Sequence, residues 1–222
     1  MIKLLPQQAH VNYVGLFSKP AFALYAAGEK LWGGLFDVFA SNQITLSDMR
    51  NASTSLSPSD QVITVDFGQT GNFRFKFDRI EATAHGDQEF KSIPELLKHT
   101  EQWLRSALPG FSFQTHLFMF ASHNKLSEGT SQEFLLGFSQ IDIPTIGTSE
   151  GSGIIFHWNI PEQNWRVQLM IDHSLNVSGG LFIQLFVRSE VDEIDYATAV
   201  RTGEELLVNA LSRVGLEVSG GS

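Results

Sequence analysis

Residues 61–77, QVITVDFGQTGNFRFKF, decide the fold class of this chain. Apolar and polar side chains alternate in the two runs that flank the link GQTGN at residues 68–72. A period of two is typical of half-buried strands, and a short glycine-containing link between two such runs predicts an antiparallel hairpin. The predicted core face of this hairpin carries Ile63, Val65, Phe67, Phe73, Phe75 and Phe77.

A helical pattern precedes the hairpin. Residues 18–40 place apolar side chains at helical spacing, with Ser18 as a candidate N-cap and Pro20 in the first turn. Gly28, Gly33 and Gly34 weaken this helix, unless they serve to let another helix or strand approach closely. The sequence therefore predicts one helix here, with its glycines as candidate packing positions.

Two further helices follow the hairpin. The first occupies residues 92–108, where Ser92 and Glu95 have the spacing of a capping box. The second begins after Asp195, a candidate N-cap, and ends at Gly215, where a glycine can adopt the left-handed conformation that terminates helices. A shorter capping-box pattern, Thr130 with Glu133, indicates one or two helical turns between them.

Strand patterns fill most of the remaining chain. They predict strands at residues 111–122, 154–160, 165–177 and 181–188. Short links favour an α+β fold, with a mostly antiparallel sheet of six to eight strands packed by three main helices. A hairpin followed by a helix occurs at residues 62–108 and again at 165–214, which suggests an internal ββα duplication. No composition break marks a linker, so we expect a single domain over residues 1–222.

Composition excludes several classes of function. The 222 residues carry a formal net charge of −9 and no cysteine. A negative chain is repelled by phosphate backbones and anionic lipid, so neither nucleic acid nor a membrane is an expected partner. Thiolate metal sites and cysteine nucleophiles are absent. No segment has the length of a signal sequence or a membrane span, so we expect a soluble cytoplasmic protein.

One motif resembles a catalytic serine. Gly147, Ser149 and Gly151 have the G-x-S-x-G spacing of many serine hydrolases, in which the serine lies between a strand and a helix. Here the pattern predicts a strand after the motif, so the helix that would stabilise an oxyanion is missing. The same segment lacks the lysine and the helix of a phosphate-binding loop. We expect a flexible glycine-serine link and no catalytic role for Ser149.

Other candidates for chemistry are equally weak. The seven histidines show no spacing that brings two imidazoles to one metal ion, so neither a metal nor a cofactor is predicted. Arg74 and Lys76 alternate with phenylalanines as in an RNA-binding strand, but the phenylalanines lie on the core face and the charges are expected at the surface. No catalytic residue is identified.

The most informative pattern for function lies near the end of the chain. In residues 181–188, Ile183, Leu185 and Val187 share one face of a strand, yet Phe182 and Phe186 occupy the other. Either a second layer covers these rings or they are exposed for a partner. Phe182 and Phe186 are therefore the candidate interface residues.

Three functional hypotheses follow. The leading one is a non-enzymatic interaction or scaffold protein whose partner is another protein, most simply a second copy in a homodimer. The alternative is an enzyme or small-ligand-binding protein with a pocket between sheet and helices, built from dispersed residues such as His116, His157 or Arg166. The third is a chaperone-like module that binds extended peptides through exposed phenylalanines.

Overall fold

The computed structural model describes residues 1–40, 44–51, 60–86, 93–138 and 152–218. In this part of the chain it contains five α-helices: α1 (Phe22–Ala26), α2 (Gly28–Phe39), α3 (Ile93–Ala107), α4 (Ser131–Leu136) and α5 (Tyr196–Arg213). The same residues form ten strands: β1 (Ile2–Phe17), β2 (Met49–Asn51), β3 (Val62–Asp66), β4 (Gly71–Lys76), β5 (Arg79–His85), β6 (Phe113–Leu126), β7 (Ile154–Ile160), β8 (Trp165–His173), β9 (Leu181–Ser189) and β10 (Leu216–Val218).

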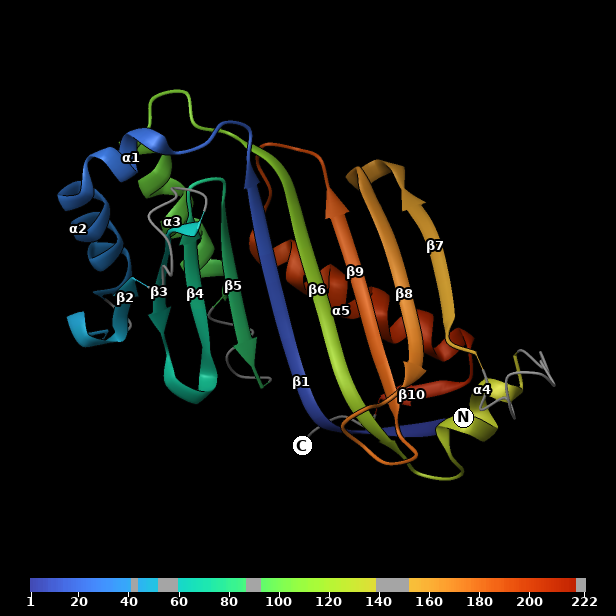
Figure 1. Ribbon diagram of the computed structural model, residues 1–222. Helices are drawn as coiled ribbons and strands as arrows, with labels where there is room; N and C mark the ends of the chain where they lie inside the picture. Colours follow the sequence, from blue (N-terminus) through green and yellow to red (C-terminus); the bar gives the residue numbers. More distant parts are fainter. Residues whose placement is uncertain (41–43, 52–59, 87–92, 139–151, 219–222) are drawn as a thin grey trace, which may run out of the picture. The chain divides into compact units, whose positions relative to one another are not determined.

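The strands form an open and mostly antiparallel sheet, so the predicted α+β class is confirmed. The strand order is β2-β3-β4-β5-β1-β6-β9-β8-β7, and β10 pairs in parallel with β1 (Figure 1). Ten strands exceed the six to eight predicted. The strands β1, β2, β5 and β10 were not predicted from the sequence. β2 and β10 have three residues each, and the core positions of β5 include the small Ala82 and Ala84. β1 has 16 residues, but regular alternation of buried residues begins only at Val11.

By residue contacts the chain divides into two compact units. Unit 1 comprises Met1–His10, Met119–Val187 and Arg201–Ser222, and unit 2 comprises Val11–Phe118 and Arg188–Val200. The strands β1, β6 and β9 contribute residues to both units. The expectation of a single domain stays a prediction.

In unit 2 the predicted hairpin is confirmed as β3 and β4. Ile63 pairs with Phe75 and Val65 pairs with Phe73, and all four side chains are buried. Because β5 continues the antiparallel pairing from β4, the hairpin is part of a three-stranded meander. The outer members of the predicted core face, Phe67 and Phe77, lie beyond the strand ends and are half-buried.

Helices α2 and α3 cover the apolar face of this meander. The Phe39 ring of α2 lies 5.0 Å from Phe73 between centroids, and the Trp103 ring of α3 lies 5.8 Å from Phe75. A methyl group added at Gly34 of α2 would lie 2.0 Å from Trp103 Nε1. The prediction that a helix glycine permits close approach of another element is therefore confirmed at Gly34.

The first predicted helix is wrong in its bounds. The structure has two helices, α1 and α2, separated at Ala27, whose φ of −105° and ψ of 58° do not continue a helix. The Ser18 hydroxyl is 2.5 Å from the Ser112 hydroxyl and lies four residues before α1, so it caps no helix. The apolar spacing alone could not reveal this break, because it continues across Ala27.

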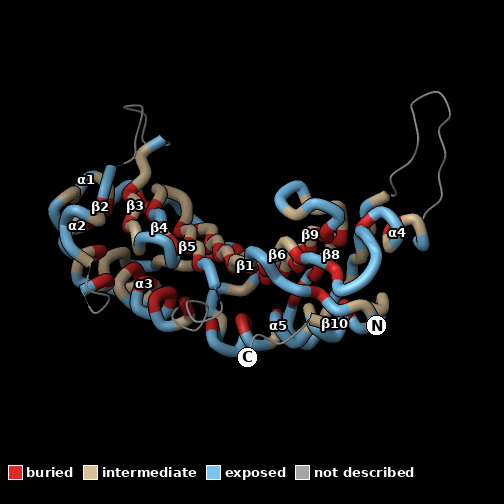
Figure 2. Tube along the Cα trace, turned by 90° about the horizontal axis from the view of Figure 1, so that it is seen from below, coloured by how far each residue is buried: buried red, intermediate tan, exposed pale blue. Residues whose placement is uncertain are grey.

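In unit 1, residues of α5 pack on one face of the sheet. Figure 2 shows this helix on one side of β6, β8 and β9, with buried residues concentrated between the two layers. A methyl group added at Gly203 of α5 would lie 2.4 Å from the Phe120 ring of β6. The contact identifies the side of β6 that carries Phe120 as the helix-covered face.

The capping predictions for α4 and α5 are confirmed. Thr130 and Glu133 form a capping box at the start of α4. The Asp195 carboxylate accepts a hydrogen bond from the Thr198 N–H at the start of α5, and Gly215 follows that helix with a φ of +83°. Ser92 lies outside the described residues, although α3 begins next to it, at Ile93.

The predicted internal repetition has a longer unit than the sequence suggests. Three consecutive strands and a helix occur as β3-β4-β5-α3 and again as β7-β8-β9-α5. Each set follows a long strand, β1 or β6, and these two strands are neighbours in the sheet. The element order thus reads βββα where the sequence pattern suggested ββα, and an internal duplication stays a prediction.

Candidate functional site

The predicted interface residues Phe182 and Phe186 lie on β9, on the face of the sheet opposite α5. The alternate residues Leu181, Ile183, Leu185 and Val187 are at most 2% exposed and form the core. Phe182 and Phe186 are only half-buried. Among the described residues of unit 1, no helix lies over their face of the sheet (Figure 1). The sequence alone did not decide whether a second layer covers these rings. The described helices of unit 1 do not form such a layer.

Neighbouring strands add further apolar and polar groups to this face. The His123 ring of β6 lies 4.8 Å from Phe182 between centroids, and the Gln184 amide contacts the Met119 sulfur. Ile155 of β7 pairs with Met170 of β8, and the Ile155 side chain is 52% exposed. We call this surface the helix-free face, defined by Met119, His123, Ile155, Met170, Phe182 and Phe186.

The catalytic-serine motif cannot be placed, because Gly147, Ser149 and Gly151 lie outside the described residues. A different serine contacts a histidine in unit 1: the Ser131 hydroxyl is 2.9 Å from His173 Nδ1. Ser131 is 4% exposed, so a substrate could not reach its hydroxyl. Asp172 instead accepts the backbone N–H of His173. This arrangement serves the packing of α4 against β8.

The residues named for a ligand pocket are divided between the two units. His116 is completely buried in unit 2. His157 and Arg166 belong to β7 and β8 in unit 1, and both are exposed. None of the three lines the pocket described next.

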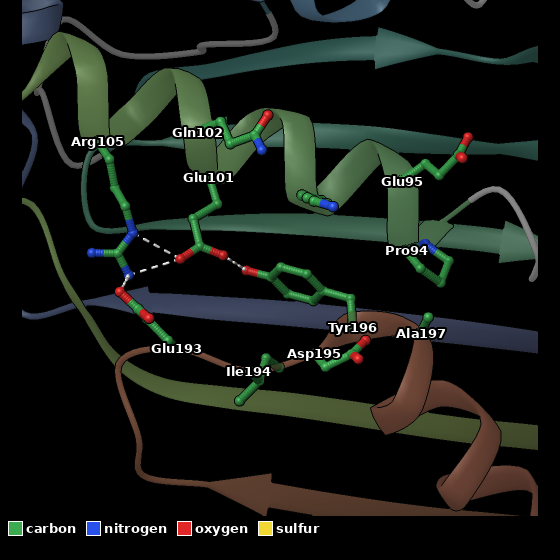
Figure 3. A pocket seen from close by; sticks show the side chains of 11 residues that line it. Pro94, Glu95, Glu101, Gln102, Arg105, Glu193, Ile194, Asp195, Tyr196 and Ala197 are labelled. Carbon is green, nitrogen blue, oxygen red and sulfur yellow. Dashed lines mark hydrogen bonds and ion pairs between the residues drawn. The ribbon is translucent and has the colours of Figure 1, made fainter.

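Unit 2 contains a pocket of about 670 Å³ between α3 and the start of α5. Figure 3 shows the Glu101 carboxylate at its centre, where it accepts hydrogen bonds from Arg105 and from the Tyr196 hydroxyl. Arg105 also pairs with Asp192 at 3.0 Å and with Glu193 at 3.8 Å. Glu101 and Arg105 are thus engaged with each other, which leaves them poorly suited to proton transfer.

Asp192 connects the pocket to the sheet. Its carboxylate accepts the Phe113 N–H at 2.7 Å as well as the guanidinium of Arg105. Partial burial would raise the pKa of Asp192, but these hydrogen bonds outweigh burial and lower that pKa below its ordinary value. Hydrogen bonding to Asp192 in turn raises the pKa of Arg105, so the ion pair stays charged.

A chain of buried side chains continues inward from the pocket. Tyr196 donates to Glu101 at 2.8 Å, and its ring meets the Tyr13 ring edge-on at 5.7 Å between centroids. The Tyr13 hydroxyl is 2.7 Å from His116 Nδ1, and His116 Nε2 is 3.2 Å from the Asp192 carbonyl oxygen. Burial raises the pKa of both tyrosines, which keeps their hydroxyl groups protonated.

No local pattern in the sequence predicted this cluster. Arg105 and Asp192 are separated by 87 positions, and no local spacing relates them. Arg74 and Lys76 were both expected at the surface: the Arg74 side chain is 49% exposed, whereas the Lys76 side chain is only 18% exposed. Glu81 on the neighbouring strand lies 2.7 Å from Lys76 and 4.0 Å from Arg74, so part of their charge is compensated.

Among the described residues, no group of three or more His, Asp or Glu side chains could hold a metal ion. None of the described helices is long and apolar enough to cross a membrane. No known protein-family profile matches this sequence, and no curated protein is significantly similar to it. The geometry of the chain is therefore the basis for any functional proposal.

Proposed function

We propose that this protein is a soluble, non-enzymatic interaction module that associates with a second copy of itself through the helix-free face of unit 1. One observation carries the proposal: Phe182 and Phe186 are half-buried on a sheet face that no described helix of unit 1 covers. Apolar rings left in contact with water favour association, at roughly 25 cal/mol for each Å² that a partner covers.

The other side chains of the helix-free face suit a contact between proteins. Methionine adapts to irregular surfaces, and both Met119 and Met170 are half-buried. Aromatic and methionine side chains are enriched in interfaces, where polar groups surround them. His123 and Gln184 supply such polar groups beside Phe182 and Met119.

Charge does not oppose contact between two copies of this face. The chain as a whole carries −9, yet β8 contributes one charge of each sign here, at Arg166 and Asp172. A two-fold axis brings the same patch of both copies together, so a patch of balanced charge does not repel itself. The second copy is therefore the simplest occupant.

Light scattering at several protein concentrations tests the proposal. The double variant Phe182→Ser/Phe186→Ser should have half the assembled mass of the wild type, with unchanged far-UV circular dichroism. Val208→Ser is the matched control, because Val208 is 53% exposed on α5 and belongs to the helix-covered side of unit 1. An unchanged mass for the double variant would overturn the proposal.

A further inference from the structure

The outermost strand of unit 1 has an unpaired edge. β7 pairs with β8 along all seven of its residues, and it ends the strand order of the sheet (Figure 1). Among the described residues no strand pairs with its other edge. Within the described part of the chain, the backbone N–H and C=O groups along that edge therefore have no strand partner, and another strand can pair with them.

β7 lacks the features that usually protect such an edge. Its sequence, IIFHWNI, contains no charged residue and no proline. The strand at the other end of the order, β2, is protected: it has three residues, and its Arg50 side chain is paired with Asp66. A long, apolar and uncharged edge strand is a template for pairing with another chain.

We propose that β7 pairs in antiparallel orientation with β7 of a second copy. This inference goes beyond the proposed function, because it uses the edge of the sheet and not its helix-free face. Any strand can pair with its own copy about a two-fold axis normal to the sheet. The register that pairs all seven residues places this axis at His157, the central residue.

The side chains of β7 are complementary in this register. Residues equidistant from His157 become cross-strand partners, so Phe156 meets Trp158 of the second copy and Ile154 meets Ile160. These four side chains are half-buried on the helix-covered face. Aromatic and aliphatic cross-strand pairs stabilise antiparallel sheets, and no like charges face each other. An unrelated peptide would match these positions only by chance, which favours the second copy.

The two contacts between copies are geometrically compatible. The axis of β7 pairing is normal to the sheet, whereas the axis of a contact between two helix-free faces lies parallel to it. Two perpendicular two-fold axes that intersect generate a closed assembly of four chains. The full protein is therefore expected to form a four-chain species. Loss of either contact, the β7 pairing or the contact between helix-free faces, should separate it into two-chain species.

Charge substitution at His157 tests the inference. His157 is exposed, so lysine or glutamate there leaves the fold of the chain intact. Because His157 shares the face of β7 with Ile155, the added charge also reaches the helix-free face, and restoration of the mass on mixing the two variants is the result specific to β7 pairing. In the proposed register each copy places residue 157 opposite itself. His157→Lys and His157→Glu should each separate β7 pairs and halve the assembled mass in light scattering, whereas an equimolar mixture of the two variants should restore the wild-type mass. Val208→Lys is the control for added charge.

The two proposals fail in different ways. If both His157 variants keep the wild-type mass, or their mixture does not restore it, β7 pairing is overturned. If the Phe182→Ser/Phe186→Ser variant keeps the wild-type mass while the His157 variants do not, only the helix-free face contact is overturned. Combining His157→Lys with the two serine substitutions should give a monomer.

Hydrogen exchange gives a second measurement that needs no substitution. Amides of Ile154–Ile160 that point away from β8 should exchange at least tenfold more slowly at a protein concentration where the four-chain species dominates than where the chains are separate. Exchange in β7 that is the same at both concentrations would overturn the inference.

Discussion

The Tyr13 hydroxyl lies 2.7 Å from His116 Nδ1, and both side chains are completely buried. Because His116 Nε2 faces the Asp192 carbonyl oxygen, which can only accept, Nε2 carries a proton and donates it. In neutral His116 the other ring nitrogen then accepts from Tyr13. The pair is thus satisfied when His116 is uncharged, and this has consequences for the stability of the protein.

Stability should decrease as the pH falls below about 6.5, the ordinary pKa of histidine in an unfolded chain. Burial lowers the pKa of His116 in the folded protein, and this effect outweighs the hydrogen bond to Asp192. Between the two pKa values the unfolded chain binds a proton that the folded chain does not. The contribution of His116 to the free energy of unfolding is therefore complete above pH 6.5 and is lost as the pH falls. Urea unfolding at pH 7.5 and pH 5.5 measures the difference.

The control for this effect is His116→Gln, which removes the titrating group. The variant should be less stable than the wild type, but its free energy of unfolding should fall less between pH 7.5 and pH 5.5. An equal fall in both proteins would show that His116 is not responsible. Carboxylates with a lowered pKa, such as Asp192, act only nearer to pH 4 and do not interfere.

Removing the Tyr13 hydroxyl should destabilise the protein by about 1–3 kcal/mol, because His116 Nδ1 would remain buried without a donor. Tyr13→Phe keeps the ring contacts, including that with Phe118 at 5.0 Å between centroids. Chemical denaturation measures the loss. In a double-mutant cycle, Tyr13→Phe should cost much less when His116 is already phenylalanine, and strictly additive losses would contradict the proposed coupling.

The Asp195 cap allows a prediction at the start of α5. Asp195→Ala should reduce the free energy of unfolding by about 0.5–2 kcal/mol, because the Thr198 N–H loses its acceptor. Thermal unfolding followed by circular dichroism measures this loss. Asp195→Asn keeps a capping oxygen and should retain most of the stability; a variant as unstable as Asp195→Ala would show that the charge, and not the cap, matters.

Local patterns predicted the parts of this fold that depend on local physics. The alternation in residues 61–77 identified β3 and β4, and the capping residues Thr130 and Asp195 marked two helix starts. The order of the strands in the sheet, by contrast, does not depend on local patterns. That β7 ends the sheet, while β1 and β6 are neighbours, follows from long-range pairing that no local period encodes.

The candidate surfaces illustrate the same distinction. Alternation placed Phe182 and Phe186 on the face opposite Ile183, and the structure agrees. Whether a helix covers that face depends on where α5 packs, so the sequence left it open. The buried pair of Tyr13 and His116, 103 positions apart, could not be predicted at all.

Helix α2 offers a paired test of close packing. Gly34→Ala should destabilise the protein by roughly 1–3 kcal/mol, because the added methyl group would lie 2.0 Å from Trp103 Nε1 and α2 would have to move away from α3. Gly33→Ala, one residue earlier in the same helix, meets no atom within 4 Å and should stabilise α2 by up to about 1 kcal/mol. Thermal unfolding of both variants separates helix propensity from packing. If Gly34→Ala were as stable as Gly33→Ala, the two helices would not approach each other as closely as the structure shows.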